Sequence, residues 1–179
     1  MKTKYFNPVL AGAALLVVGC LPSVQPLYTE KDLVFKKELV GSWVDNAASA
    51  DKRERWKFTA AEEKTYRLEI RDGNGRDGVM IAHLVKLDTG HYLDLQADPE
   101  FLEEKAAAWY QFALVPGHVF FKVGGIGEKE LILSAPDFDW IDERLKKMPE
   151  SLAHCRTKDR MTLTATTAEL QAFIVKHDT

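Results

Sequence analysis

Hydrophobic and polar positions alternate through the middle of the chain, and this pattern predicts β-strands. In residues 64–70, Tyr66 and Leu68 lie on one face of the expected strand, while Arg67 and Glu69 lie on the other. A repeat of two residues is typical of a strand that has one face buried and one face in water. The alternation therefore predicts a strand over this segment, in a sheet with one covered side.

Two β-hairpins are expected in the same part of the chain. Residues 79–87 and 91–97 alternate in the same way and are separated only by a short Asp-Thr-Gly turn. Residues 109–115 and 119–123 flank a Pro-Gly pair, which predicts a second hairpin. Further short strands are expected at residues 42–44, 56–58, 131–134 and 161–165. About eight short strands joined by tight turns predict an antiparallel sheet that closes into a barrel or a sandwich.

Three segments show helical patterns instead. Residues 100–107 follow an Asp-Pro pair that can begin a short helix. Residues 137–148 place their apolar side chains on one face, with acidic residues first and basic residues last, as the helix dipole favours. Thr166 and Glu169 have the spacing of a capping box in front of a C-terminal helix. The expected fold class is mainly β with accessory helices.

Composition narrows the class of protein. The 179 residues are 46% hydrophobic and 28% charged, which fits neither a disordered chain nor a protein with several membrane spans. The formal net charge is −3. A mildly acidic chain lacks the basic face that meets phosphates, so no nucleic-acid partner is expected.

The N-terminus has the layout of a secretory signal. Lys2 and Lys4 are the only charged residues before position 20, and residues 6–19 are uncharged and largely apolar. This stretch is too short to cross a bilayer, which takes about 20 apolar residues. A short positive region followed by a short apolar one is typical of a signal peptide.

The apolar stretch ends in Val17-Val18-Gly19-Cys20, a quartet that resembles the lipobox of bacterial lipoproteins. The resemblance implies a diacylglyceryl group on the sulfur of Cys20, cleavage after Gly19 and a membrane anchor of palmitate-like acyl chains. Each buried methylene contributes about 0.8 kcal/mol, so two or three chains hold a protein firmly. Cys155 would then have no disulfide partner within the chain. An ordinary signal peptide with an incidental cysteine, or an uncleaved anchor, is the alternative.

These observations divide the chain into three parts. Residues 1–19 are expected to be a lipoprotein signal peptide, residues 20–32 an extended tether, and residues 33–179 a single domain. The resemblance implies a location outside the cytoplasm, on the cell membrane or envelope. Leu21 is not the acidic residue that keeps lipoproteins of enteric bacteria at the inner membrane, which favours the outer membrane.

A second resemblance concerns the domain. The strand meander begins with Gly41-Ser42-Trp43, which is similar to the Gly-x-Trp of the lipocalin-like, or calycin, barrels. In those proteins this motif lies on the first strand and closes one end of the barrel. Uncharacterised bacterial lipoproteins with such a domain look similar. The resemblance implies a barrel of about eight antiparallel strands over residues 39–165. The residue pattern adds a helix before the last strand, where the family often has a tight turn, and another helix at the C-terminus.

The polar residues form no catalytic constellation. His154 and Cys155 are neighbours, but adjacent residues on a strand point to opposite faces. None of the five histidines has the spacing of a metal site, and His83 falls on an apolar strand face, where it is expected to be a core residue. The acidic segment 137–143 suits a helix start better than a calcium loop. No enzyme activity, metal or cofactor is expected.

Aromatic side chains are the feature that indicates a binding role. Inward-pointing aromatic residues of a barrel either fill its core or line an apolar pocket. The residues expected to line such a pocket are Trp43, Tyr66, Tyr110, Phe112 and Phe121. The expected function is a non-enzymatic, membrane-anchored envelope lipoprotein that binds a small apolar ligand or lipid in its barrel. The alternative is an envelope scaffold or protein-interaction module with a filled barrel.

Overall fold

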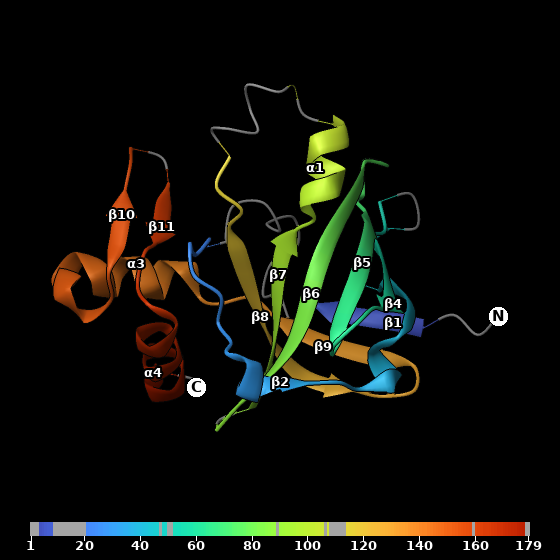
Figure 1. Cartoon of the computed structure of the whole chain (residues 1–179), viewed down its shortest axis with the longest axis horizontal. Coiled ribbons are helices and arrows are strands. Elements are labelled where there is room, and N and C mark those ends of the chain that lie inside the picture. The colour runs from blue at the N-terminus through green and yellow to red at the C-terminus, as the bar shows by residue number, and fades with distance from the viewer. Residues whose placement is uncertain are drawn as a thin grey trace.

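A computed structural model describes residues 4–8, 21–46, 48–49, 52–88, 90–105, 107, 114–158 and 160–177. Tyr110 and Phe112, which were expected to line a pocket, and Cys20 lie outside the described residues. The fold is mainly β with accessory helices, as the sequence predicts (Figure 1). Eight antiparallel strands form a barrel-like sheet that is nearly closed.

The barrel is a meander in which each strand pairs with the next. Strands β3 to β9 follow one another round the wall, and β2 pairs with β6 beyond the end of β5. The bounds of the sheet strands are β1 Lys4–Pro8, β2 Leu33–Val34, β3 Gly41–Asp45, β4 Arg55–Ala60, β5 Thr65–Arg71, β6 Asp77–Leu87, β7 Gly90–Ala97, β8 His118–Ile126 and β9 Glu130–Ser134. Strand β1 lies between β3 and β9 and runs parallel to both, so it completes the ring of strands.

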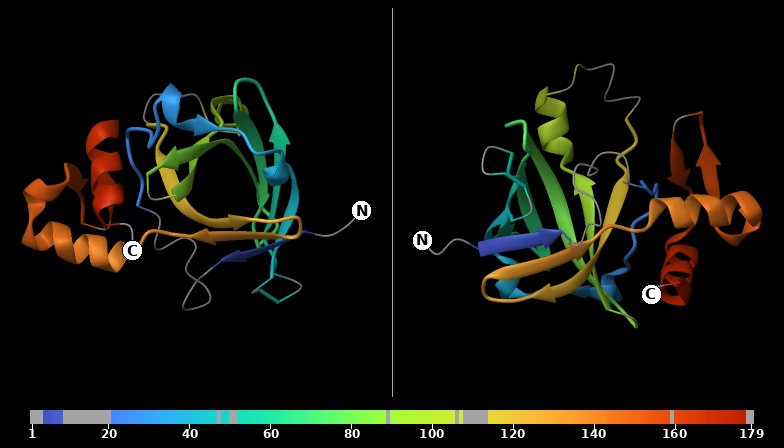
Figure 2. Two further views of the ribbon diagram at one scale, coloured as in Figure 1. Left: turned by 90° about the horizontal axis from the view of Figure 1, so that it is seen from below. Right: turned by 180° about the vertical axis from the view of Figure 1, so that it is seen from behind.

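The helices and a small hairpin lie outside the barrel. Helix α1 (Pro99–Lys105) stands at one end of the barrel, after β7. Helices α3 (Phe138–Lys147) and α4 (Thr167–His177) lie beside the wall together with the hairpin of β10 (His154–Arg156) and β11 (Met161–Leu163), as Figure 2 shows. Three short 3₁₀ helices occupy Glu30–Asp32, Lys37–Leu39 and Pro149–Ser151.

Two hydrophobic cores result from this arrangement. The first fills the barrel with side chains from β3 to β9, and it includes Trp43, Tyr66 and Phe121. The second lies between the outer face of β6 to β8 and the layer made by residues 21–33, α3 and α4; Leu27, Val85 and Phe120 belong to it. Strand β7 is therefore covered on both faces, and this explains why Tyr92 through Leu95 are all buried.

The structure corrects three expectations. Residues 161–165 supply no barrel strand, because β11 pairs with β10. Strand β8 pairs with β7 and β9, residues 114–117 form no strand, and residues 109–113 lie outside the described residues, so the second expected hairpin is not seen. The expected alternation on β6 is present: Val85 and Leu87 share the face that packs in the outer core, and Ala82 and Leu84 share the face inside the barrel.

The third correction concerns the expected tether. From Leu21 onward, residues 20–32 pack on the barrel instead of extending away from it, and Leu21 and Leu27 are buried. Ser23 is bridged to His118 of β8 on one side and to Leu163 of β11 on the other. The segment is held because its apolar side chains fill the outer core and its backbone completes the hydrogen bonds of two strand edges.

Candidate functional site: a groove between the barrel and the helices

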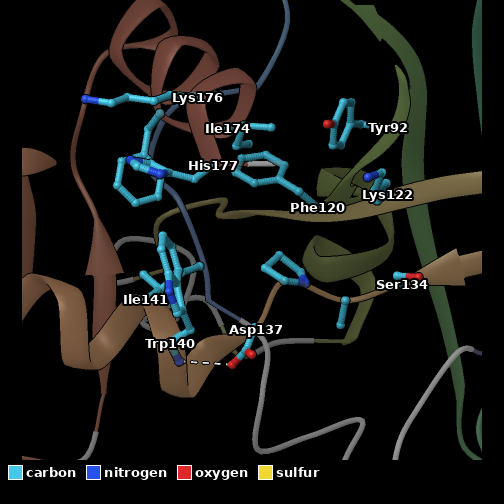
Figure 3. A pocket seen from close by; sticks show the side chains of 13 residues that line it. Tyr92, Phe120, Lys122, Ser134, Asp137, Trp140, Ile141, Ile174, Lys176 and His177 are labelled. Carbon is cyan, nitrogen blue, oxygen red and sulfur yellow. Dashed lines mark hydrogen bonds between the residues drawn. The ribbon is translucent and has the colours of Figure 1, made fainter. Parts of the chain in front are cut away.

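The best-formed cavity lies outside the barrel, between its wall and the helical layer. It has a volume of about 440 Å³ and is open to solvent on one side. Strands β7 and β8 form one side, the chain that follows β9 forms the floor, and α3 and α4 form the other side (Figure 3). A cavity of this size falls within the range of small-molecule sites.

The barrel side of the groove presents two aromatic rings and a cation. Tyr92 of β7 and Phe120 of β8 point outward from the barrel and are almost completely buried. Lys122 follows two residues after Phe120 on the same face of β8, where strand alternation places it. In Figure 3, Phe120 lies at the centre of the groove, between Tyr92 and the helices.

The helical side is a cluster of aromatic side chains. Trp140 of α3 has its ring centroid 6.2 Å from that of Phe173 and 5.3 Å from that of His177, both of α4. The Phe173 and His177 rings are themselves 4.8 Å apart in an edge-on arrangement. The guanidinium of Arg144 lies 5.5 Å from the Trp140 ring centroid, a cation–π contact.

The start of α3 fixes the position of Trp140. Asp137 precedes the helix, and its side-chain Oδ1 accepts a hydrogen bond of 2.9 Å from the Trp140 N–H. This is the expected N-cap geometry, and the expected order of acidic and basic residues along the helix is also present. Trp140 remains 42% exposed although it contacts two other rings. An aromatic side chain that is held in place and still exposed can stack on a ligand or partner.

The helical side of the groove carries the imidazole of His177 beside the charged residues Asp137 and Lys176. Burial, followed by the positive charges of Arg144 and Lys176, lowers the pKa of His177 below its ordinary value. The neutral imidazole can donate one hydrogen bond and accept another. The groove can therefore hold an apolar or aromatic molecule and supply a few polar contacts at its edges.

The pocket residues expected from the sequence lie elsewhere. Trp43, Tyr66 and Phe121 point into the barrel and belong to its core, where Trp43 and Tyr66 are completely buried. Trp43 Nε1–H donates to the Leu39 carbonyl at 2.8 Å, and the Tyr66 hydroxyl donates to the Lys36 carbonyl at 3.1 Å. These bonds satisfy both polar groups within the fold, as a filled core requires.

A buried acid and a histidine connect the barrel wall to the N-terminal segment. Asp94 of β7 is completely buried, and its Oδ1 lies 2.6 Å from His118 Nδ1. Its Oδ2 accepts a hydrogen bond of 2.7 Å from the Leu27 N–H. Ser23 lies beside His118, which places a serine, a histidine and an aspartate together, but Ser23 is completely buried and its Oγ accepts from the Gln25 N–H. The cluster therefore acts as a structural clamp.

The remaining polar candidates are structural as well. His83 lies on the outer face of β6, with its ring centroid 4.3 Å from that of Tyr28 and its Nε2 3.3 Å from Thr65 Oγ1. Cys155 is exposed and lies on β10 next to His154, whose Nδ1 is 2.9 Å from the Leu152 carbonyl oxygen. Among the described residues, no group of three or more histidine, cysteine, aspartate or glutamate side chains could hold a metal ion.

A second, shallower hollow lies on the outer surface of β3 to β6, with a volume of about 1010 Å³. Six of its thirteen lining residues are charged, and several of them pair with an acid of the lining or beside it. Lys57 lies 2.9 Å from Glu69, and Arg67 lies 2.8 Å from Asp98. The Lys57–Glu69 pair is exposed, as is typical of a solvated sheet face, whereas Asp98 is buried.

In comparisons with known proteins, no family model, no curated protein and no solved structure matches the chain. In the described part of the chain, no helix is long and apolar enough to cross a membrane.

The groove could not be found from the sequence, because its two sides come from segments far apart in the chain. The one available signal was the outward-facing set on β7 and β8, where Tyr92 and Phe120 interrupt what should be a polar face. Apolar residues on both faces of a strand indicate that something covers the outer face. The pattern does not say which element covers it.

Proposed function

We propose that this protein is a lipid-anchored protein of the bacterial cell envelope that binds a small apolar molecule on the outside of a filled barrel. The anchor is Cys20, and the binding site is the groove between β7, β8, α3 and α4. The groove carries the binding half of this proposal, because it is open and aromatic-lined. The rings inside the barrel pack against one another instead.

Sequence alone supports the anchor. The positive residues Lys2 and Lys4, the uncharged stretch 6–19 and the lipobox-like quartet ending at Cys20 occur in the order of a lipoprotein signal. Strand β1 falls inside the segment that cleavage would remove. The mature protein would then keep β2 to β9 and lose the strand between β3 and β9.

The anchor is tested by growing cells that express the full chain with radioactive palmitate. We expect label on the wild-type protein and on Cys155→Ser, and none on Cys20→Ser. Cys155 is the matched control because it is the other cysteine of the chain and is exposed. Label that persists on Cys20→Ser, or that disappears from Cys155→Ser, contradicts the anchor.

The groove is tested with a neutral apolar probe, N-phenyl-1-naphthylamine, titrated into the purified full chain. We expect Trp140→Ala to weaken binding about tenfold, which corresponds to roughly 1.4 kcal/mol. Phe35→Ala is the matched control, because Phe35 is exposed to the same degree, 43% against 42%, and lies outside the groove. Unchanged affinity in Trp140→Ala would show that the probe binds elsewhere, for example inside the barrel.

A protein partner at the same groove is the second candidate. Exposed Trp140 with Arg144 stacked on it combines the two residue types that most often dominate protein–protein contacts. Cross-linking in intact cells distinguishes the two functions. A single cross-linked protein that is lost in Trp140→Ala and kept in Phe35→Ala would favour the interaction module.

A further inference from the structure

Hydrogen bonds fix the place where the chain leaves the fold toward Cys20. Ser23 and His118 exchange two backbone hydrogen bonds, each of 2.8 Å. On the other side, the Leu163 N–H donates to the Pro22 carbonyl at 2.8 Å, and the Val24 N–H donates to the Leu163 carbonyl at 2.9 Å. Leu21 is itself 4% exposed. Cys20 is therefore the residue directly before a packed one, and the segment that begins at Leu21 runs between the start of β8 and the β10–β11 hairpin.

Exposed apolar side chains gather around this exit. The described residues include six large hydrophobic side chains that are exposed, and three of them are Val24, Leu114 and Val115. Val24 belongs to the exit segment itself. Leu114 and Val115 come just before Gly117, and Gly117 lies close to the exit segment. A β-carbon built on Gly117 would be 3.7 Å from the Cβ atom of Pro22. Val115 is the most exposed of the six, at 69%.

The hairpin on the other side of the exit has a basic tip. Lys158 and Arg160 are exposed at the turn between β10 and β11. Arg156 at the foot of this turn is engaged differently, with Nη1 2.6 Å from Asp142 Oδ1. In both side views of the molecule, the hairpin tip and the stretch that leads into β8 lie at the same end (Figures 1 and 2).

We propose that this surface, made by Leu114, Val115, Lys158 and Arg160, lies against the membrane that holds the acyl chains of Cys20. The inference rests on the proposed lipid anchor. Because no flexible spacer separates Cys20 from the packed Leu21, the acyl chains enter the bilayer next to this surface. Apolar side chains gain by entering the interface, and lysine and arginine side chains are attracted to an anionic surface. The anchor then fixes the orientation of the domain as well as its location.

The orientation is tested with the lipid-anchored protein, purified from the membranes of the cells that make it and reconstituted in vesicles of phosphatidylcholine and phosphatidylglycerol. Val115→Cys and Asp88→Cys are each made in a Cys155→Ser background and labelled with bimane. Asp88 is the matched control, because it is exposed in the β6–β7 turn at the opposite end of the barrel from α1. Doxyl-labelled lipids are then added as shallow quenchers.

We expect a loss of fluorescence at position 115 and none at position 88. The further change of Lys158 and Arg160 to glutamate is expected to reduce the loss at position 115 in vesicles with phosphatidylglycerol and to leave it unchanged without that lipid. A protein that stays on the vesicles with equal fluorescence at both positions overturns the docking surface. A protein that does not stay on the vesicles, or that takes bimane at Cys20, overturns the anchor instead.

Discussion

The carboxylate of Asp94 joins three parts of the molecule at a completely buried position. It lies on β7, contacts His118 of β8 through one oxygen and accepts the Leu27 N–H through the other. A buried carboxylate is costly unless every oxygen has a donor, and here both do. The N-terminal segment is thus held to the barrel by a charged group rather than by apolar packing alone.

Replacing this carboxylate tests the clamp. Asp94→Asn keeps the shape but turns one acceptor into a donor, so either Leu27 or His118 loses its bond. We expect the free energy of unfolding to fall by about 2–3 kcal/mol, the range for losing a buried hydrogen bond to a charged group. Urea unfolding of the full chain measures it. Asp88→Asn, at an exposed turn, is the control and should change stability by less than about 0.5 kcal/mol.

His83 makes the fold sensitive to acid. Burial, its largest cause, lowers the pKa of His83 below the ordinary 6.5, and nearby His118 lowers it further, while Asp94 and Glu30 act against this. As the pH falls from 7 toward 5.5, His83 becomes protonated in the unfolded chain while it stays neutral in a larger share of the folded chain. His83 therefore contributes a decrease in the free energy of unfolding over this range. His91 and His177, whose pKa values are also lowered, act in the same direction.

The sign is checked by following unfolding at pH 7 and pH 5.5 in wild type and in His83→Gln. The variant should lose less stability over this interval, because one of the three histidines no longer contributes. Proton NMR of the His83 ring gives its pKa directly. A value at or above 6.5 would contradict the burial argument.

For single residues, the sequence predicts which face of a strand a side chain lies on better than it predicts whether that face is buried. Alternation correctly placed Tyr66 and Leu68 on the covered face of their strand. It could not show that Asp94, on the other face of β7, would be buried, because the cover comes from residues 21–33. A polar residue on a strand is expected in water unless a distant segment is known to lie over it.

Among the elements, α4 is tied to the fold chiefly at its first turns. The expected capping box is confirmed: the Thr166 N–H donates to Glu169 Oε2 at 2.8 Å, and the Glu169 N–H donates to Thr166 Oγ1 at 3.3 Å. The bond from the Thr166 backbone lowers the pKa of Glu169. Gln171 then donates to the Leu27 carbonyl and to Asp32, which joins the helix to the N-terminal segment.

Loss of the cap should therefore loosen one side of the groove. Thr166→Ala is expected to cost about 1 kcal/mol of stability, the usual price of an N-cap side chain. Hydrogen exchange followed by mass spectrometry should show that the substitution speeds exchange in α4 relative to the wild type and leaves exchange in β7 unchanged. Thr164→Ala is the control, because Thr164 is exposed and its hydrogen bond to the Ala153 carbonyl comes from the backbone N–H, which the substitution keeps. Equal effects of the two substitutions would show that the capping box adds nothing.

The elements that the sequence predicts best are those with local signals. The hairpin of β6 and β7, the helix after Asp137 and the capped C-terminal helix depend on alternation, turns and caps within a few residues. Residues 161–165 also alternate, yet β11 pairs with β10 instead of closing the barrel. Choice of partner is set by contacts distant in sequence, which a single strand pattern does not contain.

For the molecule as a whole, the second layer on one side of the barrel creates the groove. The aromatic side chains of the barrel core point inward and pack against one another. The helices lie against the outer wall, and the groove forms between the helices and that wall. The sequence predicted a barrel with helices, but the choice between a filled and a hollow interior depends on how large side chains from opposite strands fit together. Trp43 and Phe121 come from opposite halves of the meander.

The closure of the barrel leads to the last prediction. Strand β1 pairs in parallel with β3 through residues such as Tyr5 and Val44, and with β9 through Phe6 and Leu131. Residues 4–8 cannot remain in this position once a signal peptide ending at Gly19 has been removed. In the mature protein, the amides of β3 and β9 that face this gap would lose their partners and exchange with water.

Hydrogen exchange with mass spectrometry can compare the exported protein with the full chain made by cell-free synthesis, which keeps residues 1–19. We expect faster exchange in β3 and β9 of the exported form, and equal exchange in β6 and β7, whose neighbours on both sides are unaffected. Equal exchange in all four strands would mean that β1 does not protect the barrel edges. If the exported protein still carries residues 4–8, then β1 is a permanent strand and the proposed cleavage is wrong.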